Sequence, residues 1–202
     1  TALRNGVEDD MAGTTYRASS LYHYFMTPTY YFLKSFYKKV GKYYDNYEWL
    51  PTEYGFDTQN VQDIVNSIQT KNLDILCLSM FIWNFELQVK IAKLVKQQNP
   101  NIKIIIGGPH INHSDTNVIN DYPFVDYIVY GDGEETFQML LDSFYEQIDE
   151  RTIPNLITHE FKTQHKLFKF SQFPAYNIVL DLSEEFSYDY SMAKVHAKAD
   201  QY

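Results

Sequence analysis

The residues with the clearest chemical potential form a short polar loop after an apolar run in the middle of the chain. Gly107-Gly108-Pro109-His110 follows residues 102–106, whose Ile-rich sequence is typical of a buried parallel strand. Paired glycines at the end of a strand allow a large group to approach the backbone closely. Because ligands of open α/β sheets sit at the carboxyl ends of the strands, this loop is predicted to line a binding edge. The glycines alone do not identify the ligand.

Two other loops are expected at the same edge, because each also follows a predicted strand. One runs from Ser79-Met80 to Trp83-Asn84, and the other is Gly131-Asp132-Gly133-Glu134. Trp83 offers a flat apolar surface, whereas Ser79 and Asn84 offer hydrogen-bonding groups. Gly131 and Gly133 have no side chains, so they would let a ligand approach the backbone of the third loop closely. The sequence therefore predicts three loops that together hold one ligand.

The elements that must position these loops follow from hydrophobic periodicity. Strands and helices alternate with short connections, which implies a parallel sheet covered on both faces by helices. We expect a flavodoxin-like (Rossmann-like) α/β fold with five parallel strands in the order 2-1-3-4-5. The strands are predicted at residues 21–26, 47–54, 74–80, 102–106 and 125–130, and the helices over 33–40, 61–68, 85–95 and 134–144, with a short helix near Asn117. Asn84 is the predicted N-cap of the third helix.

The ends of the chain show less pattern than its middle. Residues 1–20 are polar and aperiodic, and we interpret them as a flexible or docking arm. Residues 21–150 carry the alternating pattern and are expected to form the α/β domain. Residues 151–202 are interpreted as a small hairpin, from 157–161 and 166–170, followed by an extended linker or tail that would lead to a further domain.

Composition limits the possible functions. With 45% hydrophobic residues among 202, the chain can build a sizeable core, and its net charge of −9 argues against nucleic-acid and anionic-membrane partners. A single cysteine, Cys77, excludes an intrachain disulfide and cannot by itself hold an iron–sulfur cluster. No apolar run approaches the ~18 residues of a membrane span, and no signal peptide is recognisable, so a cytoplasmic location is expected.

The three loops, taken in order, resemble the cobalamin-binding domain of B12-dependent radical SAM enzymes. The shared blocks are SMFIWN at 79–84, GGPH at 107–110 and DYIVYGDGEETF at 126–137. The similarity covers residues 74–144 well and extends loosely to Thr27-Pro28 and Pro174. In that family cobalamin accepts a methyl group from S-adenosylmethionine and delivers it to a substrate radical.

The resemblance implies cobalamin as the cofactor and a set of residues that would bind it. That set is Thr27, Pro28, Ser79, Met80, Trp83, Asn84, Gly107, Gly108, Pro109, His110, Gly131, Gly133 and Glu134. It contains no catalytic residue and no metal ligand. In the wider B12-binding fold an Asp-x-His-x-x-Gly motif supplies a cobalt-binding histidine, but the corresponding loop here is Thr27-Pro28-Thr29-Tyr30. The resemblance therefore implies a base-off, His-off corrinoid.

One departure from the family limits what the chain can do alone. The Cys-x-x-x-Cys-x-x-Cys motif of the radical SAM domain is absent, so S-adenosylmethionine and a 4Fe-4S cluster would belong to a missing domain or a partner protein. The chain is therefore not expected to be catalytic by itself, and whether it is part of an enzyme stays open.

Two other functions remain as alternatives. The chain could be a degenerate B12-fold module that binds a protein, or a nucleotide-binding domain, although no G-x-G-x-x-G or Walker motif supports the latter. Among single residues, His110 and His113 lack a third metal ligand nearby in sequence. The acids of the third loop suit a helix N-terminus, and Cys77 is expected to be an inert buried thiol.

Overall fold

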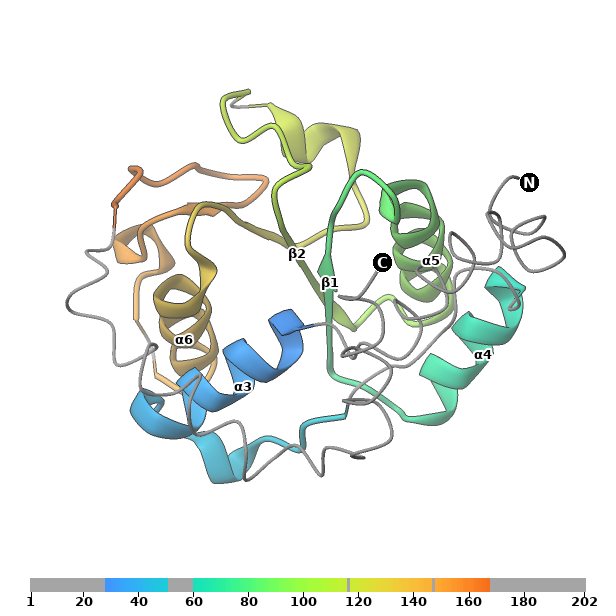
Figure 1. Ribbon diagram of the computed structural model, residues 1–202, viewed down its shortest axis with the longest axis horizontal. Helices are drawn as coiled ribbons and strands as arrows, with labels where there is room; N and C mark the ends of the chain where they lie inside the picture. The colour runs from blue at the N-terminus through green and yellow to red at the C-terminus, as the bar shows by residue number, and fades with distance from the viewer. Residues whose placement is uncertain (1–27, 51–59, 116, 147, 168–202) are drawn as a thin grey trace, which may run out of the picture. The chain divides into compact units, whose positions relative to one another are not determined.

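The computed structural model describes residues 28–50, 60–115, 117–146 and 148–167. The chain divides into two compact units, and the sheet lies in the unit Phe36–Phe173. Of the other unit, Thr1–Ser35 with Pro174–Tyr202, only residues 28–35 are described. The elements, shown in Figure 1, are α3 (Pro28–Val40), η1 (Tyr44–Asn46), α4 (Val61–Thr70), β1 (Ile75–Ser79), α5 (Phe85–Gln98), β2 (Lys103–Gly107), η2 (Val118–Asp121), β3 (Tyr127–Val129), α6 (Gly133–Ser143), η3 (Glu150–Thr152) and β4 (Leu156–Ile157).

The described strands form a mixed four-stranded sheet in the order β1-β2-β3-β4. β1, β2 and β3 are parallel, with Leu78 opposite Ile106 and Ile106 opposite Ile128. β4 is antiparallel to β3 and places Leu156 opposite Val129. The carboxyl ends of the three parallel strands therefore lie along one edge of the sheet.

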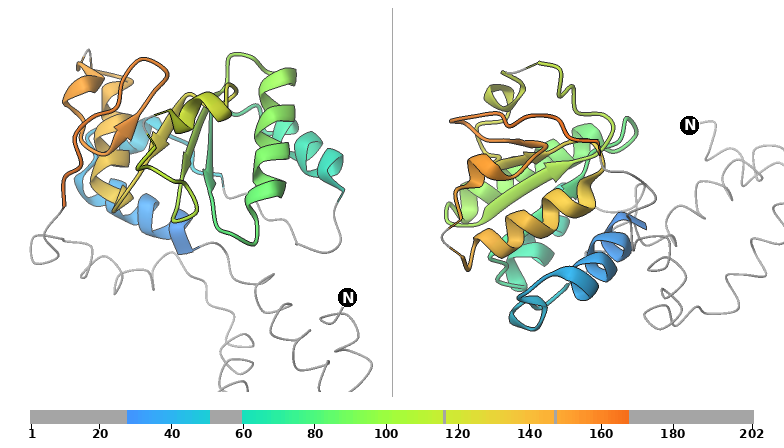
Figure 2. Two further views of the ribbon diagram at one scale, coloured as in Figure 1. Left: turned by 90° about the horizontal axis from the view of Figure 1, so that it is seen from above. Right: turned by 90° about the vertical axis from the view of Figure 1, so that its left-hand side faces the viewer.

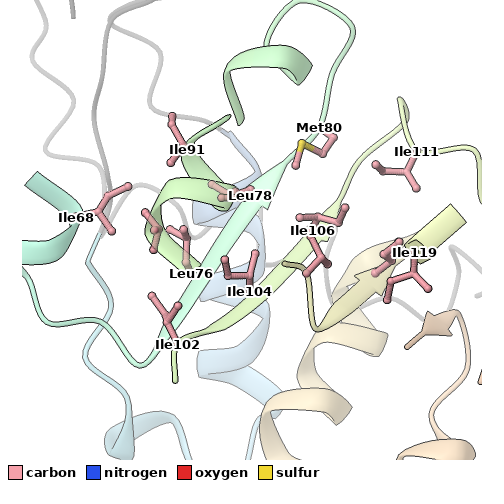
Figure 3. Packing of buried hydrophobic residues seen from close by; sticks show 14 of the residues in the cluster. Ile68, Leu76, Leu78, Met80, Ile91, Ile102, Ile104, Ile106, Ile111 and Ile119 are labelled. Carbon is pink, nitrogen blue, oxygen red and sulfur yellow. The ribbon is translucent and has the colours of Figure 1, made fainter. Parts of the chain in front are cut away.

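Apolar side chains cover both faces of this sheet. Figure 2 shows α4 and α5 on one side of the strands and α6 on the other. Leu76 and Leu78 of β1 join Ile104 and Ile106 of β2 in one buried cluster with α4 and α5, as Figure 3 shows. The opposite face packs on α6, whose Phe137, Leu140 and Leu141 are buried. Alternate residues of each strand thus serve opposite layers.

The structure confirms most of the elements expected between residues 33 and 144. All four helices and the three central strands form close to their predicted bounds, and Gly41 follows α3, its N–H donating to the Tyr37 carbonyl at 2.8 Å. The short helix near Asn117 is the 3-10 helix η2. The three parallel strands support an α/β fold of the expected kind.

Three expectations about the sheet are not met. Residues 47–50 are not a strand, because Tyr47 turns its ring onto Tyr37 and its hydroxyl donates to the Leu141 carbonyl at 2.8 Å. The sheet is not purely parallel, because β4 pairs with β3 in the antiparallel direction. The predicted hairpin has other bounds: the Thr158 N–H donates to the Phe161 carbonyl at 2.8 Å and the Thr163 N–H to the Leu156 carbonyl at 2.9 Å, while residues 168–170 lie outside the described residues.

The remaining strands of the predicted five lie outside the described residues. These are residues 21–26 and the rest of 47–54, so the order 2-1-3-4-5 stays a prediction. The described part of the chain holds no helix long and apolar enough to cross a membrane.

A charged clamp ties α5 to the amino ends of β2 and β3. Lys96 Nζ donates to the Ile102 carbonyl at 2.6 Å and to both carboxylate oxygens of Asp126, at 2.9 and 3.0 Å. Asp126 Oδ2 in turn accepts the Ile104 N–H at 2.7 Å. The pair is partly shielded from water, so it contributes more than a fully exposed ion pair.

We expect Lys96→Ala to lower the free energy of unfolding by about 1–2 kcal/mol, because Asp126 and the Ile102 carbonyl lose their common donor. Urea denaturation followed by circular dichroism measures this change. Lys93→Ala, an exposed lysine one turn earlier on α5, is the control and should stay within about 0.5 kcal/mol of the original chain. Equal effects of the two substitutions would contradict a structural role for the clamp.

Candidate functional site

The loops after β1 and β2 are joined by their backbones at the carboxyl edge. Met80 N–H donates to the Gly107 carbonyl at 2.6 Å, and the His110 N–H donates to the Met80 carbonyl at 3.2 Å. Gly108 has a φ of +107°, and a Cβ atom there would lie 2.5 Å from the Met80 oxygen. Met80 itself is fully buried, so the two loops form one packed unit.

This packing changes the interpretation of the two glycines. The space left by the missing side chain of Gly108 is taken by the Met80 backbone rather than left open for a ligand. A Cβ on Gly107 would lie 3.0 Å from the Val129 carbonyl oxygen of β3. Gly108 therefore lets the loop after β2 approach the Met80 backbone, and Gly107 lets β2 approach the end of β3. A ligand would contact the surface of the loops that these approaches shape.

Asn84 has a structural task at the end of the first loop. Its Oδ1 accepts the Phe81 N–H at 2.8 Å, and its Nδ2 donates to the Ser79 carbonyl at 3.0 Å. The side chain is buried and makes no capping bond to α5, although Asn84 occupies the N-cap position as predicted. Because both ends of its amide are engaged within the loop, Asn84 shapes the loop instead of reaching outward.

The loop that Asn84 closes presents apolar side chains to solvent. Ile82 is 76% exposed and Trp83 is 63% exposed. The Trp83 ring stacks on Phe81 with a centroid distance of 4.7 Å and an interplanar angle of 11°. A flat aromatic surface is thus held at the carboxyl end of β1, as the sequence predicted for Trp83.

His110 and His113 of the second loop lie three residues apart in the sequence, but their side chains contact different rings. The His110 ring lies 4.4 Å from Phe85 at the start of α5, whereas the His113 ring stacks on Tyr130 at 5.1 Å. Pro109 and His110 are exposed. Within the described residues, no group of three or more His, Cys, Asp or Glu side chains could hold a metal ion.

The third loop turns sharply from β3 into α6. Gly131 adopts a φ of +71°, which favours glycine, and Gly133 is the first residue of α6. Burial is the main cause that raises the pKa of the Glu134 carboxyl above its ordinary value of 4.5.

The other predicted site residues lie outside these three stretches or at their margins. Ser79 is the last residue of β1. Thr27 lies outside the described residues, and Pro28 begins α3, but its side chain is not described.

Sequence reasoning missed a group of side chains beside the third loop. The rings of His113, Tyr130 and His165 lie within 5.1 to 6.2 Å of one another, and Lys162 Nζ stands 5.4 Å from the Tyr130 centroid. Lys162 also donates to the His113 carbonyl. Residues 162 and 165 lie in a polar stretch without periodicity, so no sequence signal places them at this edge.

Cys77 also departs from expectation. Its residue lies on the face of β1 opposite Leu76 and Leu78, and it is exposed rather than buried. Tyr47 lies near enough to interact electrostatically with this thiol. The surrounding protein nevertheless raises the pKa of the thiol to about 12 by desolvation, so the structure corrects the expected burial of the side chain but supports an inert thiol.

A cavity of about 240 Å³ lies elsewhere, around the second half of α6. Lys42, Gln138, Asp142 and Glu146 are among its lining residues, and none of the predicted site residues is. Lys42 Nζ is 2.8 Å from Glu146 Oε1, and the buried Asp142 accepts the Tyr37 hydroxyl at 2.7 Å. These contacts hold the end of α3 and the residues after it against α6. The charged groups at this cavity therefore have a structural role.

Comparison with known proteins adds to this geometry. Residues 52–141 match the model of the B12 binding domain family, and the match includes all three loops up to the second half of α6. Residues 52–141 are thus similar to the B12 binding domain family, which indicates cobalamin as the cofactor. The resemblance seen in the sequence is confirmed.

Curated relatives point to one kind of enzyme. The chain is 44% identical over 68 residues to the cobalamin-dependent radical SAM methyltransferase TokK of Streptomyces tokunonensis, which is 34% of this chain and 10% of the relative. It is 32% identical over 108 residues to the 2-(S-pantetheinyl)-carbapenam-3-carboxylate methyltransferase of Streptantibioticus cattleyicolor, covering 50% of this chain and 16% of the relative. The chain thus spans less than a fifth of the length of these relatives.

The residues at the carboxyl edge fit a corrinoid. A corrin has a broad apolar face rimmed by amides, and the stacked Phe81–Trp83 pair offers a flat apolar surface of matching character. Exposure of Ile82 and Trp83 side by side costs free energy in water, which a covering ligand would recover.

We expect Gly108→Ala to lower the free energy of unfolding by about 2–4 kcal/mol, because the new methyl group meets the Met80 backbone at a positive φ. Gly133→Ala is the matched control, since its Cβ would touch Val129 Cγ1 at an ordinary 3.5 Å. That substitution should be neutral or stabilise by up to about 1 kcal/mol. Urea denaturation compares the two, and a tolerated Gly108→Ala would show that the two loops are less tightly joined.

Glu134→Gln should make the folded chain more stable at neutral pH. A carboxyl with a raised folded-state pKa favours folding below pH 4.5, and that contribution is lost as the pH rises through the folded pKa. The neutral amide avoids this loss, so the stability gain should vanish in acid and grow towards pH 7. Unfolding midpoints between pH 4 and 7 test this, with Glu135→Gln as the control for removing a charge from the same helical turn.

Proposed function

We propose that the chain is the cobalamin-binding part of a B12-dependent radical SAM methyltransferase system. The observation that carries the proposal is the exposed Trp83 ring, stacked on Phe81, at the carboxyl edge of the segment that matches the B12 binding domain. The names of the relatives support the methyltransferase assignment. Cobalamin, when bound, supplies a cobalt centre that can carry a methyl group.

In this proposal the residues of the chain bind and orient the corrinoid. Trp83 would cover one face of the corrin and exclude water from it, and Ser79 and the Pro109-His110 turn would contact the nucleotide tail. Gly131, Gly133 and Glu134 would contact the cofactor from the third loop, and Thr27 and Pro28 complete the proposed set. Met80, Asn84, Gly107 and Gly108 act by positioning these loops, as their contacts indicate.

The corrinoid is proposed to bind base-off and His-off, because the sequence has no Asp-x-His-x-x-Gly motif. S-adenosylmethionine and the 4Fe-4S cluster are assigned to a further domain or partner protein, because Cys77 is the single cysteine of the chain. The domain would extend over residues 21–150, between an arm at 1–20 and a connecting segment at 151–202. The cytoplasm is the proposed location.

Anaerobic incubation with hydroxocobalamin, desalting and a UV–visible spectrum test the proposal directly. We expect about one corrinoid per chain with a base-off spectrum. Trp83→Ala should weaken binding by about 10- to 100-fold, because the apolar surface is lost, and Trp83→Phe should recover part of it. Ile148→Ala, which truncates an exposed apolar residue at the cavity beside α6, should bind normally.

A folded chain that retains no corrinoid would contradict the proposal. The exposed Ile82 and Trp83 would then favour the alternative, a B12-fold module that binds another protein through this surface. Circular dichroism of each variant separates loss of binding from loss of folding.

A further inference from the structure

His165 is oriented by a buried asparagine beside the third loop. Asn155 is fully buried and has a φ of +59°. Its Oδ1 accepts the Lys166 N–H at 2.7 Å, and its Nδ2 donates to the Lys166 carbonyl at 2.9 Å. These two bonds fix which end of the Asn155 amide is oxygen.

The orientation of Asn155 decides where the proton of His165 lies. His165 Nδ1 is 3.0 Å from Asn155 Oδ1, and an amide oxygen can only accept. Nδ1 therefore carries hydrogen, and in the neutral ring Nε2 carries the lone pair. His165 is exposed, so this lone pair can serve as a hydrogen-bond acceptor for a ligand.

The position of the ring is at the edge proposed to bind the corrinoid. His165 Cε1 would lie 3.3 Å from a Cβ atom on Gly131, and the ring lies 5.7 Å from Tyr130 at the end of β3. It also lies 6.2 Å from His113, which belongs to the loop after β2. Figure 1 shows the segment after β4 beside the carboxyl end of the sheet.

We infer that His165 is a cofactor-binding residue whose Nε2 accepts a hydrogen bond from a primary amide at the rim of the corrin. This inference rests on the proposed function. The rim amides can donate, which matches the lone pair of Nε2, whereas the Asn84 side chain is buried and bonded within its own loop. Tyr130 and Asn155 are positioning residues for the ring.

Two substitutions at His165 separate recognition from folding. Asparagine can place an N–H near the position of Nδ1 but has nothing at Nε2, so His165→Asn should fold normally and bind cobalamin about 3- to 10-fold more weakly. Glutamine places its polar end near Nε2, so His165→Gln should bind within about twofold of the original chain. Spectroscopic titration of the full chain gives the affinities, and urea denaturation checks folding.

The cofactor provides an independent test. In cobalamin monocarboxylic acids one rim amide is replaced by a carboxylate, which accepts but does not donate. One such acid should bind the original chain about 3- to 10-fold more weakly than cobalamin and show no further loss with His165→Asn. Additive losses for every acid would overturn the inference, as would nitrogen hyperfine coupling from His165 in the Co(II) spectrum. If the original chain bound no cobalamin, the proposed function itself would fail instead.

Discussion

The contact between Met80 and Gly108 is the constraint on which the candidate site depends. A Cβ atom at Gly108 would overlap the Met80 oxygen at 2.5 Å, so the loops after β1 and β2 can meet only where one residue lacks a side chain. Backbone hydrogen bonds then hold Met80 between Gly107 and His110. Met80 is buried at this contact, and the chain then leaves the core, with Phe81 half-buried and Ile82 and Trp83 exposed at the carboxyl edge.

The stability that supports such a loop comes from the layers on either side of the sheet. One face of β1 and β2 is buried against α4 and α5, and the Lys96–Asp126 clamp fixes the opposite ends of the strands. Asn84 adds two hydrogen bonds inside the loop itself. Together these contacts hold two large apolar side chains in water, where each forgoes about 1.5–3 kcal/mol of burial. Such an arrangement is typical of a surface that another molecule covers.

The sequence predicted the central elements well because their patterns are local. The apolar runs of β1 and β2 and the spacing of α4, α5 and α6 each lie within one short window. β4 has two residues, too few to show a period, and its pairing with β3 joins residues about 28 positions apart. The segment at 47–50 has the composition of a strand, but Tyr47 packs its ring on Tyr37 and donates its hydroxyl to the Leu141 carbonyl, contacts that no local pattern shows. Non-local contacts decided both cases.

The same distinction explains the site. Sequence motifs identified the three loops, yet they could not separate residues that touch a ligand from residues that shape the loops. Gly108 and Asn84 belong to the second group, because their space and their hydrogen bonds are used within the protein. His165 had no motif, since its place beside Gly131 depends on Asn155 and on the return of the chain along β4. A motif marks where a site lies, whereas the hydrogen-bond partners of each side chain decide which atoms remain for the ligand.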